Sequence, residues 1–135
     1  MPDPVHIRRE ILERLLDEAR RNPEIECCGL LAGTGGVITE ILPAHNALVS
    51  ATAYEIAPEE LFRLFRHLRD SDLDHLGIYH SHPATDNAPS PTDIARAYYP
   101  DAAYFIISLR TEAPRPVRAF EIRDGVVMEV EIVQE

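Results

Sequence analysis

The run HSHPATDNAPSPTD (residues 80–93) places two histidines one residue apart, ahead of a proline-rich loop that closes on Ser-Pro-Thr-Asp. On a β-strand, residues i and i+2 project from the same face, so His80 and His82 are predicted to lie side by side. Two imidazoles so placed can hold one metal ion, and a catalytic zinc site takes three protein ligands and keeps one position open. Asp93, just past the loop, is the expected third ligand.

The Ser-Pro-Thr-Asp run is also a typical helix start. Ser90 fits the N-cap position, a proline follows it, and Asp93 stands at the third helical position, as in a capping box. Local sequence alone leaves both roles open for Asp93. The two roles are compatible, because a cap would fix the helix end that presents the carboxylate.

Composition limits the classes of function. The chain has 135 residues, 45% of them hydrophobic, which suits one domain (residues 1–135) with one packed core. Its formal net charge of −10 argues against a sequence-independent grip on nucleic acid, whose phosphates need a basic surface. No secretory signal or membrane-spanning run is visible. The only cysteines, Cys27 and Cys28, are adjacent and cannot build a disulfide framework, which predicts a reducing cytoplasm.

Hydrophobic periodicity and turn residues predict an α+β (mixed α/β) fold with a largely antiparallel sheet flanked by helices. The expected elements are a helix from Asp3-Pro4 to Asn22-Pro23, strands at 28–33 and 37–44 around a turn at 34–36, a loop leading into a short strand at 45–57, a helix at 58–71, a strand at 75–82, a short helix at 92–99, a central strand at 103–109, and a hairpin of 117–122 and 126–133 around Asp124-Gly125. The helix at 58–71 is expected to present one apolar side, formed by Leu61, Phe62, Leu64, Phe65 and Leu68.

Two segments together resemble a known family. His80-Ser81-His82-Pro83, a spacer and Ser90-Pro91-Thr92-Asp93 match the JAMM motif of the MPN+ zinc metalloproteases, H-S/T-H-P followed by S-x-x-D. The upstream run PEIECCGLLAG (residues 23–33) is similar to the family segment P-x-x-E-x-C-G-L-L-x-G and sets Glu26 at its glutamate. The resemblance extends over nearly the whole chain and implies an MPN/JAMM-like fold, related to the cytidine-deaminase fold, in a minimal prokaryotic-type member.

The resemblance also implies roles for single residues. His80, His82 and Asp93 would bind one Zn²⁺ with a water in the fourth position, although Fe²⁺ or Mn²⁺ also suits such a ligand set. Glu26 would take a proton from that water and pass it to the departing amine, and Ser90 would stabilise the oxyanion. By itself Glu26 is typical of a solvated acid, and Glu24 is its close rival as the base.

The implied reaction is hydrolysis of an amide or isopeptide bond, without a covalent intermediate, at the extended C-terminal tail of a ubiquitin-like or sulfur-carrier protein. A catalytically inactive MPN scaffold is the alternative, and a homodimer is left open. A zinc deaminase is disfavoured, because its H-x-E and P-C-x-x-C motifs are absent from the sequence. Structural or surface roles are expected for the remaining candidates, which are Cys27, Cys28, His6, His45, His67, His75, Ser81, Thr85, Asp86 and Asn87.

Overall fold

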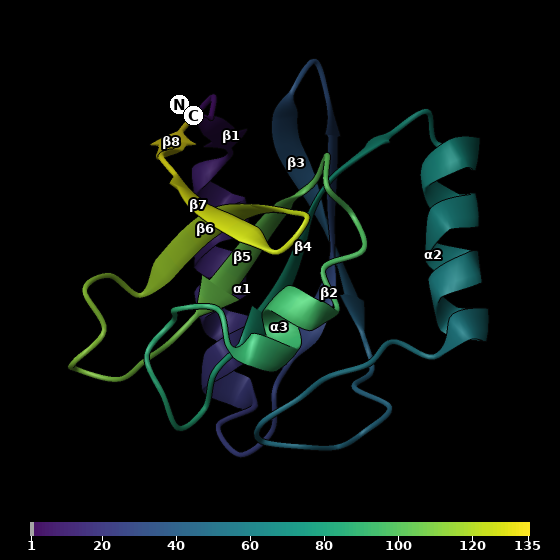
Figure 1. Cartoon of the computed structure of the whole chain (residues 1–135). Coiled ribbons are helices and arrows are strands. Elements are labelled where there is room, and N and C mark those ends of the chain that lie inside the picture. Colours follow the sequence, from purple (N-terminus) through teal and green to yellow (C-terminus); the bar gives the residue numbers. More distant parts are fainter. Residues whose placement is uncertain (1) are drawn as a thin grey trace.

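The computed structural model describes residues 2–135, and its core is one eight-stranded sheet with helices on both faces (Figure 1). The strand order is β7-β6-β5-β4-β2-β3-β1-β8. In chain order the elements are β1 (Val5–Ile7), α1 (Arg9–Arg21), β2 (Cys28–Thr34), β3 (Val37–Ala44), α2 (Pro58–Asp70), β4 (Asp74–Ser81), α3 (Pro91–Ala95), β5 (Ala103–Ile107), β6 (Val117–Arg123), β7 (Val126–Val130) and β8 (Ile132–Gln134).

The sheet is mixed. Pairings β2–β3, β2–β4, β5–β6 and β6–β7 are antiparallel, whereas β4–β5, β1–β3 and β1–β8 are parallel. This confirms the predicted α+β class with its mostly antiparallel sheet. The three central strands β2, β4 and β5 are almost wholly buried, because helices cover both of their faces.

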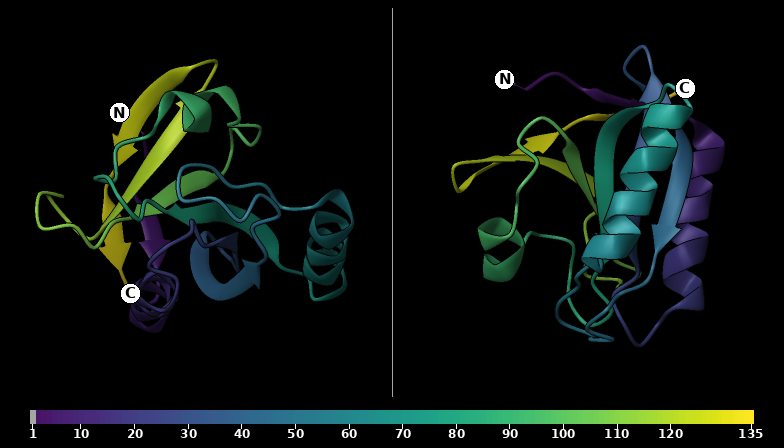
Figure 2. Two further views of the ribbon diagram at one scale, coloured as in Figure 1. Left: turned by 90° about the horizontal axis from the view of Figure 1, so that it is seen from below. Right: turned by 90° about the vertical axis from the view of Figure 1, so that its right-hand side faces the viewer.

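Each face of the sheet has its own apolar cluster. α1 packs through Ile11, Leu15 and Ala19 against one face, and α2 and α3 lie over the other, where Leu68 and Ile94 contact it (Figure 1, Figure 2). Of the predicted apolar side of α2, Leu61, Leu64, Phe65 and Leu68 are at least half-buried. Phe62 does not share that side and is 64% exposed.

The predicted hairpins form as expected. Gly35 and Gly36 join β2 to β3 with φ of 60° and 76°, and Asp124 and Gly125 join β6 to β7 with φ of 51° and 78°. Two successive left-handed residues are what a tight hairpin turn needs to match the twist of its strands.

The two chain ends depart from the prediction. Val5–Ile7 is a strand and α1 begins only at Arg9, so the predicted helix start at Asp3-Pro4 is wrong. β-branched Val5 and Ile7 alternate in a way that suits a strand, and β1 pairs in parallel with both β3 and β8. Likewise the last predicted strand, 126–133, is two strands, because the chain leaves β7 and pairs with β1 at the other edge of the sheet.

Residues 45–57 contain no strand, contrary to the prediction. The side chain of Asn46 satisfies the backbone that a strand ladder would otherwise pair. Its Nδ2 donates to the carbonyls of Glu26, Ser50 and Ala53, and its Oδ1 accepts from the N–H groups of Leu48 and Glu55.

The short helix ends earlier than predicted. α3 stops at Ala95 instead of Tyr99, and the Tyr99 N–H donates to the Tyr104 hydroxyl at 2.9 Å instead of continuing the helix. No helix within residues 2–135 is long and apolar enough to cross a membrane.

Candidate metal centre

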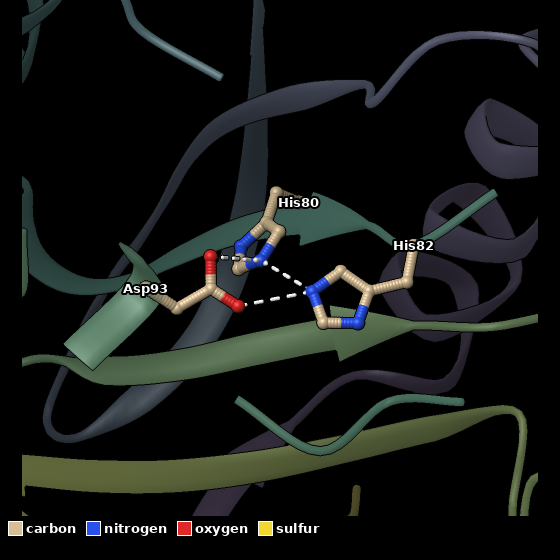
Figure 3. Close-up of side chains that lie close together, drawn as sticks. All are labelled: His80, His82 and Asp93. Carbon is tan, nitrogen blue, oxygen red and sulfur yellow. Dashed lines mark hydrogen bonds and ion pairs between the residues drawn. The ribbon is translucent and has the colours of Figure 1, made fainter. Parts of the chain in front are cut away.

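His80, His82 and Asp93 converge at the end of β4 (Figure 3). His80 Nε2 lies 3.1 Å from His82 Nε2 and 3.2 Å from Asp93 Oδ1, and His82 Nε2 lies 3.0 Å from Asp93 Oδ2. The three side chains are 2%, 5% and 7% exposed. Within the described residues, this is the only group of three or more His, Cys, Asp or Glu side chains that is close enough to share one metal ion.

The sheet positions both histidines. His80 lies on β4 between Cys28 of β2 and Ile106 of β5. His82 follows the last residue of β4, and its N–H still donates to the Ile107 carbonyl of β5 at 2.9 Å. The strand geometry therefore continues through His82, which is why residues 80 and 82 present their rings to the same point, as their spacing predicts.

The orientation of the His82 ring is fixed by the loop that follows. His82 Nδ1 lies 2.7 Å from the Asp86 carbonyl oxygen, which can only accept, so Nδ1 carries a proton. In neutral His82 the lone pair is therefore on Nε2 and faces the Asp93 carboxylate. This is the usual arrangement for a histidine that binds a metal through one nitrogen and a backbone carbonyl through the other.

Asp93 is held by the capping box that its sequence predicts. The Ser90 N–H donates to Asp93 Oδ2 at 2.9 Å, and the Asp93 N–H donates to Ser90 Oγ at 3.0 Å. Burial opposes ionisation, but the hydrogen bonds and charges of His80 and His82 outweigh it and hold the pKa of Asp93 far below its ordinary value. The cap thus holds an ionised carboxylate within reach of both histidines, where it is compatible with the predicted ligand role.

The histidine pKa values shift in opposite directions. For His80, complete burial outweighs the attraction of Asp93 and lowers the pKa. For His82, burial also lowers the pKa. The hydrogen bonds to Asp93 and to the Asp86 carbonyl outweigh this effect, so the pKa of His82 is raised overall. His80 is therefore neutral at pH 7, which is the form that binds a metal.

The three donor atoms fit a small dication. Zinc bonds of about 2.0–2.1 Å in a tetrahedron set neighbouring ligand atoms about 3.3 Å apart. The observed separations of 3.0, 3.1 and 3.2 Å are close to that value. Two imidazole nitrogens and a carboxylate oxygen make an N₂O set, which suits zinc and also Fe²⁺ or Mn²⁺.

Glu26 is buried beside this cluster. It precedes β2, is 2% exposed, and its Oε1 has no hydrogen-bond partner in the described residues. Desolvation raises its pKa to about 7, while the charge of His82 lowers it and that of Asp93 raises it. An unpartnered buried carboxylate is costly, so its presence next to the candidate ligand set favours a functional role for Glu26. Glu24 is exposed.

The backbone of Glu26 is anchored by the loop at 45–57. Its N–H donates to the Ser50 carbonyl at 2.8 Å, and its carbonyl accepts from Asn46 Nδ2 at 3.1 Å. Tyr54, from the same loop, stacks on His80 with ring centroids 4.6 Å apart. Neither Asn46 nor Tyr54 was identified from the sequence as part of the site, because both act through contacts distant along the chain.

The remaining candidates lie outside the cluster. Cys27 and Cys28 are buried, and burial raises the pKa of both thiols, that of Cys28 to about 12, which disfavours a thiolate nucleophile or ligand. His6 and His45 pair with Glu135 and Glu60, His67 is exposed, and His75 packs between Phe65 and Tyr99. Asn87 is fully buried, and its Nδ2 donates to the backbone carbonyls of Ile106 and Arg115.

The chain matches known proteins along most of its length. The sequence profile of prokaryotic homologs of the JAB domain matches residues 8–123. A CysO-cysteine peptidase of Mycobacterium tuberculosis is 37% identical over 125 residues, 91% of this chain and 86% of that protein. A desampylase of Haloferax volcanii is 38% identical over 104 residues, 75% of each chain. The solution structure of DSY2949 from Desulfitobacterium hafniense superposes with a TM-score of 0.84 and 31% identity, covering 96% of this chain and 92% of that one.

Proposed function

This chain belongs to the family of prokaryotic homologs of the JAB domain, and we propose that it is a zinc-dependent hydrolase acting on the C-terminal tail of a ubiquitin-like or sulfur-carrier protein. The bond it cleaves is an amide, and the chain acts as one catalytic domain with one metal ion bound by His80, His82 and Asp93. The free, buried cysteines agree with a reducing cytoplasm as its location.

One observation carries this proposal: a preformed N₂O ligand set lies beside a buried carboxylate that has an unpartnered oxygen and a pKa of about 7. A structural metal site needs no such carboxylate, whereas hydrolysis needs a base that can accept and return a proton near neutral pH. The combination favours an enzyme over an inactive scaffold.

The reaction follows from the chemistry of these residues. A bound zinc ion supplies a Lewis acid that lowers the pKa of a water molecule from about 15.7 toward about 7. Glu26 accepts a proton from the attacking water while the water oxygen adds to the scissile carbonyl carbon. When the C–N bond breaks, Glu26 returns that proton to the departing amine. The products are a carboxylic acid and a free amine.

We propose a second role for Ser90 besides capping α3. Its Oγ accepts the Asp93 N–H, which leaves the hydroxyl hydrogen free to donate. We propose that this hydroxyl donates a hydrogen bond to the oxyanion that develops on the scissile carbonyl. The capping bond fixes Oγ in advance, so no reorganisation is needed when negative charge appears.

The substrate class rests on the relatives. Their names describe a CysO-cysteine peptidase and a desampylase, which are activities on small carrier proteins and on their conjugates. For this chain we propose a carrier protein whose extended C-terminal tail enters the site, with an amino acid, peptide or protein joined to it through the scissile amide.

The test uses a ubiquitin-like carrier protein with a C-terminal amino-acid or peptide extension, and mass spectrometry of the products. Cleavage is expected for the zinc-loaded protein and is expected to be lost on chelation or with Glu26→Gln. Glu24→Gln is the matched control, since it removes the same charge from an exposed position two residues away. Cleavage that survives both chelation and Glu26→Gln rules out this mechanism. Elemental analysis without stoichiometric metal would favour the scaffold.

A further inference from the structure

A cavity of about 270 Å³ opens directly beside the metal centre. Asp93 forms part of its wall, and so does Tyr54, whose ring stacks on His80. The cavity is therefore continuous with the place where the scissile bond must lie. Its volume is below the range typical of sites for drug-sized ligands, and suits a ligand of about one amino-acid residue.

The cavity is built from side chains that are themselves fixed. Ile56 and Ile78, both buried, make its apolar floor. Tyr99 forms a wall, and the Tyr104 hydroxyl holds its backbone while Phe65 and His75 pack against its ring. A preformed apolar pocket with a few polar groups at its rim is the usual form of a small-ligand site.

The rim carries one unneutralised cation. Arg96 is the single basic residue among the cavity-lining residues of the described chain, and it forms no ion pair within residues 2–135. Arg118 and Arg123, by contrast, pair with Glu129 and Asp101. In a chain of net charge −10, an unpaired arginine at a cavity rim is available for an anionic ligand, and its planar fork matches a carboxylate.

The rim also limits how much negative charge the ligand can carry. Glu55 lines the same cavity and is exposed, so a second carboxylate on the ligand meets like charge. The cavity thus suits a residue with one carboxylate and an uncharged side chain.

We propose that this cavity receives the leaving residue of the substrate and that Arg96 binds its free α-carboxylate. The inference rests on the proposed hydrolase function and deepens it, because it defines the leaving group. The enzyme would remove a single C-terminal amino acid from the carrier tail more readily than it would cleave a bond inside a longer chain, where the leaving residue has an amide in place of the carboxylate.

Paired substrates test this proposal. A carrier tail ending in one added alanine is prepared as the free acid and as the C-terminal carboxamide. The zinc-loaded protein is expected to show a kcat/KM about tenfold higher for the acid, as expected for a charge-assisted bidentate contact. Arg96→Gln is expected to bring the ratio to about one. Arg9→Gln removes the same charge from α1, on the other face of the sheet, and keeps the wild-type ratio.

A binding measurement separates this inference from the hydrolysis itself. Calorimetry follows acetyl-Gly-Gly-Ala and its amide binding to Glu26→Gln protein, with and without Arg96→Gln. Tighter binding of the acid that depends on Arg96, without any cleavage by the wild type, upholds the cavity assignment and refutes the hydrolase. Cleavage with equal rates for acid and amide overturns the cavity assignment and leaves the hydrolase standing. Equal binding of the acid and the amide peptide to the Glu26→Gln protein also overturns the cavity assignment.

Discussion

Cys27 and Ser81 exchange two hydrogen bonds: the Cys27 N–H donates to the Ser81 hydroxyl at 2.9 Å, and the Ser81 N–H donates to the Cys27 carbonyl at 3.1 Å. Cys27 follows Glu26, and Ser81 stands between the two histidines. This exchange joins the segment that carries the candidate base to the strand end that carries two candidate metal ligands. We therefore infer that Ser81 acts through its neighbours and fixes the separation between the candidate base and the candidate ligands.

We therefore expect Ser81→Ala to lower kcat while metal binding persists. The substitution leaves the buried Cys27 N–H without an acceptor, at a cost of about 1–3 kcal/mol in the free energy of unfolding. Ser81→Thr keeps a hydroxyl and is expected to restore most of the activity. Urea denaturation, kcat and zinc content are measured for all three proteins. If Ser81→Ala kept the wild-type kcat and stability, the proposed positioning role of Ser81 would be contradicted.

Local patterns predicted the convergence of His80, His82 and Asp93 because local geometry produces it. The strand period places His80 and His82 on one face, and the capping box at Ser90 presents Asp93. Both patterns depend only on residues that are close together in the sequence, so the sequence alone is enough to predict them. The same is true of the hairpin at Asp124-Gly125, whose turn residues adopt the left-handed conformation that a tight hairpin requires.

Features that depend on distant partners were missed or misread. Ile7 fits the apolar spacing of α1, yet it lies on β1 because β3 and β8 pair there. Asn46 reads as an ordinary loop residue, and only the fold shows that it binds the backbone of Glu26. Tyr54 is not part of a recognisable motif. It stacks on His80 only because the loop at 45–57 folds back over the end of β4. Pairing and packing across the chain decide these positions.

Zinc is expected to stabilise the protein through Asp93. A ligand that binds only the folded state at about 100 times its dissociation constant raises the free energy of unfolding by about 2.7 kcal/mol. Asp93→Asn keeps an oxygen that can accept the Ser90 N–H but removes the anionic ligand, so it should abolish most of this gain. Asp74→Asn, at the exposed start of β4, is the matched control. Thermal unfolding with and without zinc measures the effect, and an equal gain in both variants contradicts the assignment.

Asn46 is expected to control the position of the base. Asn46→Asp keeps the Oδ1 acceptor but replaces the amide donor that binds the carbonyls of Glu26, Ser50 and Ala53 with a second oxygen. Four acceptors that are at least partly buried then face one another, so we expect a loss of about 2–4 kcal/mol in the free energy of unfolding and a lower kcat. Asn22→Asp removes one Nδ2 bond to a carbonyl at the end of α1 and serves as the control. Equal changes in kcat and in the free energy of unfolding for Asn46→Asp and Asn22→Asp would contradict this role of Asn46.

In the metal-free protein, Glu26 should contribute a loss of stability as the pH rises from about 4.5 to about 7. Glu26 has an ordinary pKa of 4.5 when the chain is unfolded and about 7 when it is folded, because burial disfavours the charged form. The folded state therefore holds a proton that the unfolded state releases across this range. Glu26→Gln should remove that slope, and Glu24→Gln should keep it. Urea titrations at several pH values measure the slope, and an unchanged slope in Glu26→Gln refutes the assignment.

His75 should contribute a slope of the opposite sign. Burial lowers its pKa below the ordinary 6.5, although a hydrogen bond with the Gly77 backbone opposes this. Its stabilisation is thus complete above pH 6.5 and declines as the pH falls toward the folded pKa, because the unfolded state binds the proton first. His75→Phe keeps the aromatic contacts with Phe65 and Tyr99 and removes a buried Nε2 that has no partner in the described residues.

Because the Glu26 and His75 slopes oppose each other, each is visible only as a difference between variants. His75→Phe placed in the Glu26→Gln background should remove both of these contributions from the stability profile between about pH 5 and pH 7. His75→Phe alone should steepen the loss of stability toward pH 7, since the His75 slope no longer opposes that of Glu26. Urea denaturation of the four metal-free proteins at matched pH values measures both differences. A profile for His75→Phe that is parallel to the wild-type profile would show that His75 is not protonated on unfolding in this range.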